Sequence, residues 1–136
     1  MYGNSVYRAV HAVIETEHFL RDARRAGVSE DERTDIVAML SGNPMLGDVM
    51  PGTGGARKFR VAGRGKGKSG GYRVISYFGG DDVPVFLLGV LSKGERANLT
   101  KAEQNEVRKE LSGLASDYRA SVRSKATRRQ AERKSR

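Results

Sequence analysis

The sequence predicts one small α+β domain, in which helices pack on one face of a mostly antiparallel sheet in the order β-α-α-β-β-β-α. Three observations support this fold class. Two amphipathic helices with start and stop signals come early, three strand patterns joined by short links follow, and a third helix comes last. Short links between consecutive strands favour antiparallel pairing. A chain of 136 residues can bury one modest core.

The first expected elements are a short strand and two helices, at residues 12–16, 17–26 and 30–40. The first helix carries an apolar stripe, and Gly27 stands where a glycine commonly ends a helix. Ser29 and Glu32 form the Ser-x-x-Glu pattern of a capping box, which marks the start of the second helix. Together these signals predict a helical hairpin.

Three further strands are expected at residues 57–62, 72–78 and 85–91. In the first of them, Phe59 and Val61 alternate with Lys58 and Arg60, so the two pairs point to opposite faces of the sheet. The second alternates in the same way. The third, VFLLGVL, is apolar on both faces, which predicts a central strand.

The last helix is expected to begin at the capping-box pattern of Thr100 and Glu103 and to end near Tyr118. Beyond it, residues 119–136 hold eight basic side chains and one acidic one, a net +7 of the chain's +9, which leaves +2 for the rest. The expected divisions are an N-terminal arm, a folded domain and a basic tail, at residues 1–11, 12–118 and 119–136.

Two questions about the basic tail stay open at this point. The tail either extends the last helix or is disordered. It serves either as an electrostatic arm that increases encounter with RNA, or as a solvated extension that becomes ordered only with a partner. A net +7 in so short a segment is unusual for a neutral spacer and favours the first use.

The composition excludes several classes of protein. With no cysteine, the chain can form neither disulfides nor thiolate zinc sites. No apolar run approaches the roughly 20 residues that span a bilayer. His11 and Glu15 interrupt the apolar N-terminal stretch, which is unlike a signal peptide. We therefore expect a cytoplasmic protein without membrane contact, and no motif indicates a cofactor or a metal.

One stretch, residues 57–78, is basic and rich in glycine. It contains no acid and seven cations: Arg57, Lys58, Arg60, Arg64, Lys66, Lys68 and Arg73. Gly67, Lys68 and Ser69 match the end of a phosphate-binding P-loop, but Ala62 stands where that motif needs its first glycine. The stretch also leads into a strand pattern, whereas a P-loop must lead into a helix. Nucleotide hydrolysis is therefore disfavoured.

RNA binding explains the same stretch better. Lys58 and Arg60 share one strand face, and if Arg73 and Tyr77 lie on that side too, they complete a cationic groove with an aromatic wall. Phosphates and a stacked base fit such a groove. The simpler alternative is that the cations solvate an exposed sheet face or protect an edge. An ordinary solvated face mixes both signs of charge, which argues against that alternative.

The segments GKGKSGGYRVISYF, PVFLLGVL and SKGERANLTKAEQNEVRKEL resemble the RelE/HigB toxins of bacterial type II toxin–antitoxin systems. The HigB-type branch, which has a lysine- and glycine-rich loop before a Gly-Gly-x-Arg strand, is the most similar. The likeness covers about residues 12–114, and its specific part is 57–100. It implies a compact α+β fold and an mRNA endoribonuclease, or mRNA interferase, that acts in the ribosomal A site and inhibits translation.

The resemblance also implies partners. These are mRNA, the ribosome and a cognate antitoxin, which we expect to be a helix-turn-helix protein encoded nearby. Without its antitoxin the toxin is expected to be a monomer. The alternative is a non-catalytic nucleic-acid-binding or regulatory protein that has the same fold.

Cleavage of this kind needs no metal, because the 2′-hydroxyl attacks the adjacent phosphate while the enzyme removes a proton and stabilises the charged transition state. The resemblance places Arg73 on the scissile phosphate. The expected catalytic residues are Arg73, Lys66, Lys68 and Lys93, and the expected RNA-binding residues are Lys58, Arg60, Arg64, Tyr77 and Arg96. A lysine crowded by other cations could act as the base. Glu95 is another candidate base, and a mechanism that uses His11 and His18 is less favoured.

Overall fold

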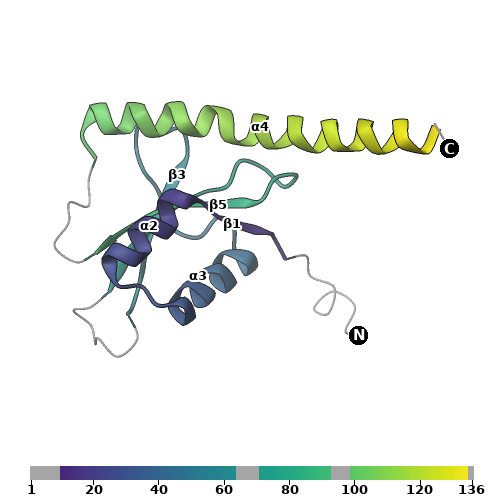
Figure 1. Cartoon of the computed structure of the whole chain (residues 1–136). Coiled ribbons are helices and arrows are strands. Elements are labelled where there is room, and N and C mark those ends of the chain that lie inside the picture. The colour runs from purple at the N-terminus through teal and green to yellow at the C-terminus, as the bar shows by residue number, and fades with distance from the viewer. Residues whose placement is uncertain (1–9, 64–70, 93–98, 135–136) are drawn as a thin grey trace, which may run out of the picture.

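The computed structural model of the chain describes residues 10–63, 71–92 and 99–134 (Figure 1). Its elements are β1 (Val13–Glu15), α2 (Glu17–Ala26), α3 (Glu30–Gly42), β2 (Asp48–Val49), β3 (Ala56–Val61), β4 (Tyr72–Tyr77), β5 (Val85–Ser92) and α4 (Lys101–Lys134). This order confirms the predicted α+β class and adds one strand, β2. The added strand lies in a glycine-rich connector and is only two residues long, which explains why no periodic pattern revealed it.

The strands form a five-stranded sheet in the order β1-β5-β4-β3-β2. Only β1 and β5 are parallel; every other pair is antiparallel, as the short links predicted. β5 lies between β1 and β4, which confirms that it is an interior strand. A register shift at Ile75 and Ser76 interrupts the ladder between β4 and β5.

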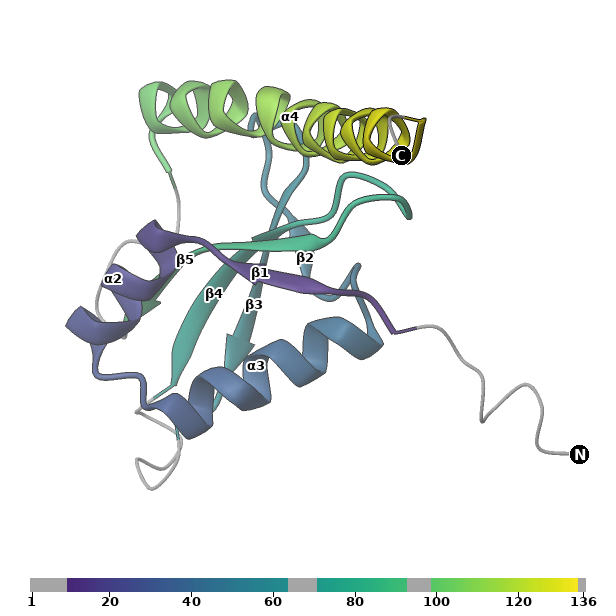
Figure 2. The same cartoon turned by 45° about the vertical axis from the view of Figure 1, so that its right-hand side comes forward.

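Two core clusters lie on opposite faces of the sheet. The larger one joins α2 and α3 to residues such as Phe59 and Val74. The smaller one joins α4 to Ile75 and Tyr77. Figure 2 shows α3 and α4 on opposite sides of the sheet. The expectation that the helices share one face therefore needs correction for α4, because β4 presents apolar side chains on both faces.

Three of the predicted helix boundaries are confirmed in atomic detail. Gly27 ends α2 with a φ of 79°, a conformation that favours glycine. Ser29 and Glu32 form a reciprocal capping box at the start of α3. The same exchange of hydrogen bonds joins Thr100 and Glu103 at the start of α4.

As far as Lys134 the basic tail extends the last helix, which is one of the two alternatives that the sequence left open. α4 continues past Tyr118 to Lys134, and every residue from 120 to 133 is exposed. Figure 1 shows this second half projecting beyond the rest of the domain. No helix among the described residues is both long enough and apolar enough to cross a membrane.

Candidate nucleic-acid interface

The register of β3 and β4 brings cations together on the face that α4 covers. Arg60 and Arg73 are direct partners in the antiparallel ladder, so their side chains leave the same face. Lys58 lies two residues from Arg60 on that face, and Tyr77 lies on the same face of β4. This arrangement meets the condition that the sequence set for a cationic groove. We call Lys58, Arg60 and Arg73 the cationic row.

No ion pair in the part of the chain that the structure describes involves any member of the cationic row. Other arginines have structural partners: Arg57 donates to the carbonyl oxygens of Met45 and Gly47 at 3.1 and 3.0 Å. Like charges placed directly opposite each other destabilise a sheet. Arg60 and Arg73 are therefore electrostatically unfavourable neighbours within the described protein.

Tyr77 is placed differently from the cations. Its ring is half-buried in the core cluster beneath α4, where a β-carbon on Gly79 would approach both the Tyr77 hydroxyl and Ala115. Packing against α4 therefore accounts for the aromatic side chain in this conformation. A stacking role for Tyr77 stays a prediction.

The remaining predicted site residues lie outside the described residues. They are Arg64, Lys66, Lys68, Lys93 and Arg96. The strand ends that lead into them are described: Val61 is paired with Tyr72, and Tyr72 with Ser92, so the ends of β3 and β5 and the start of β4 adjoin. The Arg60–Arg73 pair lies one position from this end of the sheet. β4 is a strand, so the helix that a P-loop needs is absent after the glycine-rich segment.

A cavity of about 250 Å³ adjoins the cationic row, and the sequence did not reveal it. Its apolar floor includes Ile75 and Leu91, the ladder partners of Lys58 and Arg73. Its acidic wall consists of Asp22, Glu103, Glu106 and Glu110. Glu103, Glu106 and Glu110 are three and four residues apart in the sequence. This spacing is the signal that could have placed them on one face of α4.

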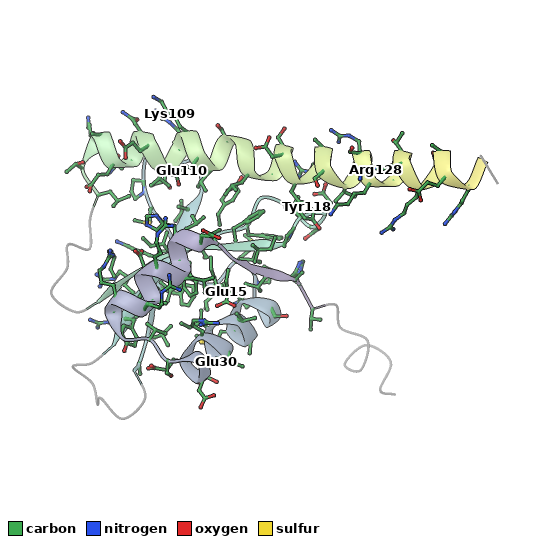
Figure 3. The ribbon with its side chains drawn as sticks, viewed as in Figure 1. Glu15, Glu30, Lys109, Glu110, Tyr118 and Arg128 are labelled. Carbon is green, nitrogen blue, oxygen red and sulfur yellow. The ribbon has the colours of Figure 1, made fainter. Side chains whose placement is uncertain are left out.

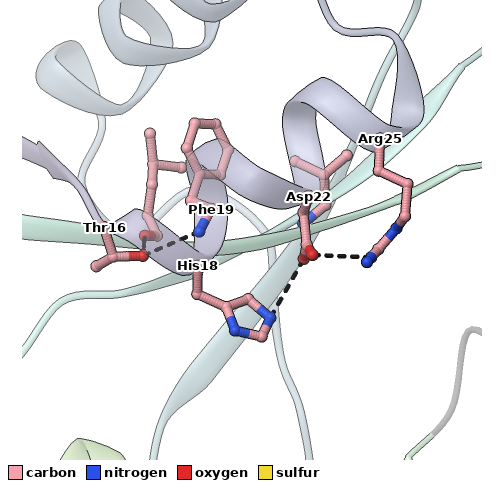
Figure 4. Close-up of polar contacts among 7 residues, drawn as sticks. Thr16, His18, Phe19, Asp22 and Arg25 are labelled. Carbon is pink, nitrogen blue, oxygen red and sulfur yellow. Dashed lines mark hydrogen bonds and ion pairs between the residues drawn. The ribbon is translucent and has the colours of Figure 1, made fainter.

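Asp22 fastens α2 to β5 at the edge of this cavity (Figure 4). β1 ends opposite Leu87, so the Val90 amide has no strand partner there. Asp22 replaces the missing strand: its Oδ2 accepts from the Val90 amide at 3.1 Å, and its Oδ1 accepts from Arg25 at 2.8 Å. The Asp22 side chain is buried, whereas Arg25 is exposed. The sequence could not show this contact, because it joins residues far apart in the chain.

The two histidines lie in different surroundings. His18 Nε2 is 3.5 Å from Asp22 Oδ2, and the imidazole lines the cavity. His11 instead packs edge-on against Phe78, with ring centroids 5.3 Å apart. The described geometry therefore gives no support to a mechanism in which both act on one phosphate. No cluster of three or more His, Cys, Asp or Glu among the described residues is arranged to hold a metal ion.

Comparison with known proteins places this arrangement in a family. A family model described as the RelE toxin of the RelE/RelB toxin–antitoxin system matches residues 11–132. The chain belongs to the RelE toxin family. It is therefore the toxin component of a type II toxin–antitoxin system, and a cognate antitoxin is its implied partner. The match is to the RelE family as a whole, so the closer likeness to the HigB branch stays a prediction.

One solved structure similar to this RelE-family chain is a mutant of the E. coli toxin RelE in the free state. The two sequences are 17% identical, and the TM-score is 0.47. The similarity covers 65% of this chain and 87% of the E. coli chain.

The long last helix of this RelE-family toxin is fixed to the body by an ion pair. Arg119 donates two hydrogen bonds to the Asp82 carboxylate, at 2.6 and 2.8 Å. These bonds hold the pKa of Asp82 below its ordinary value of 3.8. Both groups are open to solvent, so the pair positions α4 more than it stabilises the fold. We call this pair the α4 clamp.

Proposed function

We propose that this RelE-family toxin is an endoribonuclease that cuts ribosome-bound mRNA in the A site and so inhibits translation. The observation that carries the proposal is the Arg60–Arg73 pair, which has no carboxylate partner in the described chain. A fold that holds two like charges together incurs an electrostatic cost. A phosphate bound between them offsets that cost and gains charge-assisted hydrogen bonds.

The proposed chemistry is metal-independent attack of a 2′-hydroxyl on the adjacent phosphate. The planar guanidinium of Arg73 holds the scissile phosphate and favours the transition state, in which negative charge accumulates. Arg60 and Lys58 bind neighbouring phosphates along β3. The other proposed catalytic residues are Lys66, Lys68 and Lys93, and the other proposed RNA contacts are Arg64, Arg96 and Tyr77.

The cavity adds a candidate for the proton acceptor. Glu106 is an exposed carboxylate in the cavity wall, beside the floor residues that partner Lys58 and Arg73. A carboxylate within reach of the 2′-hydroxyl can remove its proton as the bond to phosphorus forms. Glu106 therefore joins the lysines as a candidate base.

The decisive experiment compares Arg73→Ala with Arg24→Ala, a change of an exposed arginine on α2, away from the cationic row. Each variant is induced in growing cells, and 5′ ends of mRNA are mapped. We expect Arg73→Ala to lower cleavage about 10²- to 10³-fold and to abolish growth arrest, since removing one transition-state donor has an effect of that size. Arg24→Ala should arrest growth like the wild type. Circular dichroism should show both variants folded.

Two outcomes would contradict the proposal. A fully toxic Arg73→Ala variant would mean that the site lies elsewhere. Intact mRNA and normal growth after induction of the wild-type chain would remove the nuclease and leave the alternative, a non-catalytic nucleic-acid-binding protein. Co-purification with a helix-turn-helix protein encoded by the neighbouring gene would identify the proposed antitoxin.

A further inference from the structure

The second half of α4 is a basic helix that no other described part of the chain covers. We call residues 120–134 the basic arm. Its cations are Arg123, Lys125, Arg128, Arg129, Arg133 and Lys134, and its one carboxylate is Glu132, which gives a net charge of +5. Figure 3 shows Arg128 on this projecting part, beyond Tyr118. Such a density of charge on an exposed helix indicates a ligand of opposite charge.

The arm continues an anchored helix, which explains how so polar a segment is helical. Leu111 and Ala115, in the first half of α4, are buried against the sheet. The α4 clamp then fixes Arg119, the residue just before the arm. Helix propagation from a formed turn costs far less than nucleation, and cations near a helix C-terminus interact favourably with its dipole. The arm is thus about 22 Å of helix held at one end.

The residue types of the arm exclude partners that need apolar contact. Val122 is its only apolar side chain larger than alanine. A membrane-surface helix needs a face of large apolar or aromatic residues. A coiled coil with a second copy needs apolar a and d positions, and a protein groove takes apolar anchors at helical spacing. The arm has none of these.

The placement of the cations suits two rows of phosphates. At 100° per residue, the widest strip of the arm without cations is formed by Ala120, Ser124, Thr127 and Ala131. On the same helical wheel, the positions of Lys134 and Arg123 lie to one side of this strip and that of Arg128 to the other. The narrow, small-sided strip allows the helix to approach a surface closely, while cations on both sides reach outward. The wide, shallow minor groove of an RNA double helix presents two phosphate backbones in this way.

We propose that the basic arm binds the phosphate backbone of double-helical RNA, as a second contact separate from the cationic row. The choice of RNA over other polyanions rests on the proposed function, in which the toxin acts on the RNA-rich ribosome. Four of the six arm cations are arginines, whose planar fork binds phosphate bidentately. The contact is electrostatic and reads no sequence.

The test measures how salt weakens binding of the full chain to a blunt RNA duplex of about 16 base pairs. In the arm variant, Arg123, Arg128, Arg129 and Arg133 are changed to Gln. In the control variant, four exposed cations elsewhere are changed to Gln, namely Arg21, Arg24, Lys101 and Lys109. Both variants lose the same charge, so only the position of the lost charge differs.

The arm variant should reduce the magnitude of the slope of log affinity against log salt by about 3.6, since it loses four phosphate contacts and each contributes roughly 0.9. Affinity at 0.1 M salt should fall at least about tenfold. The control should keep the wild-type slope within about half a unit. Equal slopes in all three proteins would overturn the proposal. So would loss of binding to phosphatidylserine vesicles in the arm variant with duplex binding unchanged.

The experiments distinguish a failure of the arm proposal from a failure of the proposed nuclease function. Arm-dependent duplex binding without any mRNA cleavage would refute the proposed function and keep the arm as an RNA contact. If mRNA is cleaved but duplex binding is the same in the arm variant as in the wild type, the proposed function stands and the arm proposal is refuted. Arg73→Ala should keep the wild-type salt slope, because the cationic row lies on the sheet and not on the arm.

Discussion

At the scale of single residues, small side chains decide how the cavity is built. Gly89 lies on β5 where α2 crosses, and a β-carbon there would stand 2.9 Å from Asp22 Oδ2 and 3.8 Å from His18 Cδ2. Asp22 cannot easily move, because it is buried and holds the Val90 amide. The absence of a side chain at Gly89 thus keeps α2 close to the sheet and the cavity open on that side.

Replacing Gly89 with alanine should therefore destabilise the fold by about 1–3 kcal/mol, the usual cost of overpacking. Gly113→Ala is the matched control. Gly113 lies inside α4, and its new β-carbon would meet only Asp117, at an ordinary contact distance of 3.4 Å. Alanine there should stabilise the protein by about 0.5–1 kcal/mol through helix propensity. Urea denaturation of both variants measures the two effects, and a stable Gly89→Ala protein would refute this account of the contact.

Residue alternation predicted part of the candidate site. The alternation of apolar and basic side chains correctly placed Phe59 and Val61 on one face of β3 and Lys58 and Arg60 on the other. Alternation within one strand does not determine how that strand is aligned with its neighbour, however. The sequence therefore could not show that Arg60 stands opposite Arg73. Nor could it show the acidic cavity, whose wall combines a residue of α2 with residues of α4. Only the three-dimensional fold brings those segments together.

At the scale of elements, local signals predicted the helix starts and left the end of the last helix open. Capping boxes and Gly27 act within a few residues, so the sequence alone reveals them. The end of α4 was placed near Tyr118 because the apolar stripe stops there. α4 continues because extending an existing helix needs no apolar face. The apolar stripe also could not tell which face of the sheet α4 covers.

The α4 clamp should respond to pH only in strong acid. Arg119 lowers the folded-state pKa of Asp82 below 3.8, so the clamp's contribution is present above that value and is lost as pH falls through the folded pKa. The natural chain has no cysteine, so Ala38→Cys with Ser124→Cys gives two unique spin-label sites. We expect a narrow distance distribution from pH 8 to pH 5, and a broad one only when the pH falls through the folded-state pKa of Asp82, which lies below 3.8.

Asp82→Asn is the control for the clamp. It removes the charge and one acceptor, so the distribution should be broad at every pH. If the distance distribution of the spin-labelled protein that keeps Asp82 broadens between pH 8 and pH 5, groups other than Asp82 hold α4.

At the scale of the whole molecule, the covered sheet and the basic arm are separate parts. The two core clusters draw on residues up to Ala115 and none from the arm. Most of the net charge lies in residues 119–136, which hold +7 of the chain's +9. The globular body is therefore close to neutral.

This separation predicts that the body folds without the arm. A chain that ends after Arg119 should melt within about 3 °C of the full chain, since no deleted residue belongs to either core cluster. Leu111→Ala is the contrasting change: Leu111 is 2% exposed, and its truncation should cost about 2–5 kcal/mol. Thermal circular dichroism compares the two. A drop of more than about 10 °C in the shortened chain would mean that the arm contributes to the core stability.

Because α4 is one unbroken helix, its two halves cannot move independently. The first half lies over the sheet face that carries the cationic row, the second half is the basic arm, and the pair of Arg119 and Asp82 stands between them. Displacing the first half from the sheet would therefore also displace the arm and strain the pair between them. If the proposed RNA contact fixes the arm, a partner that displaces the first half must act against that contact as well.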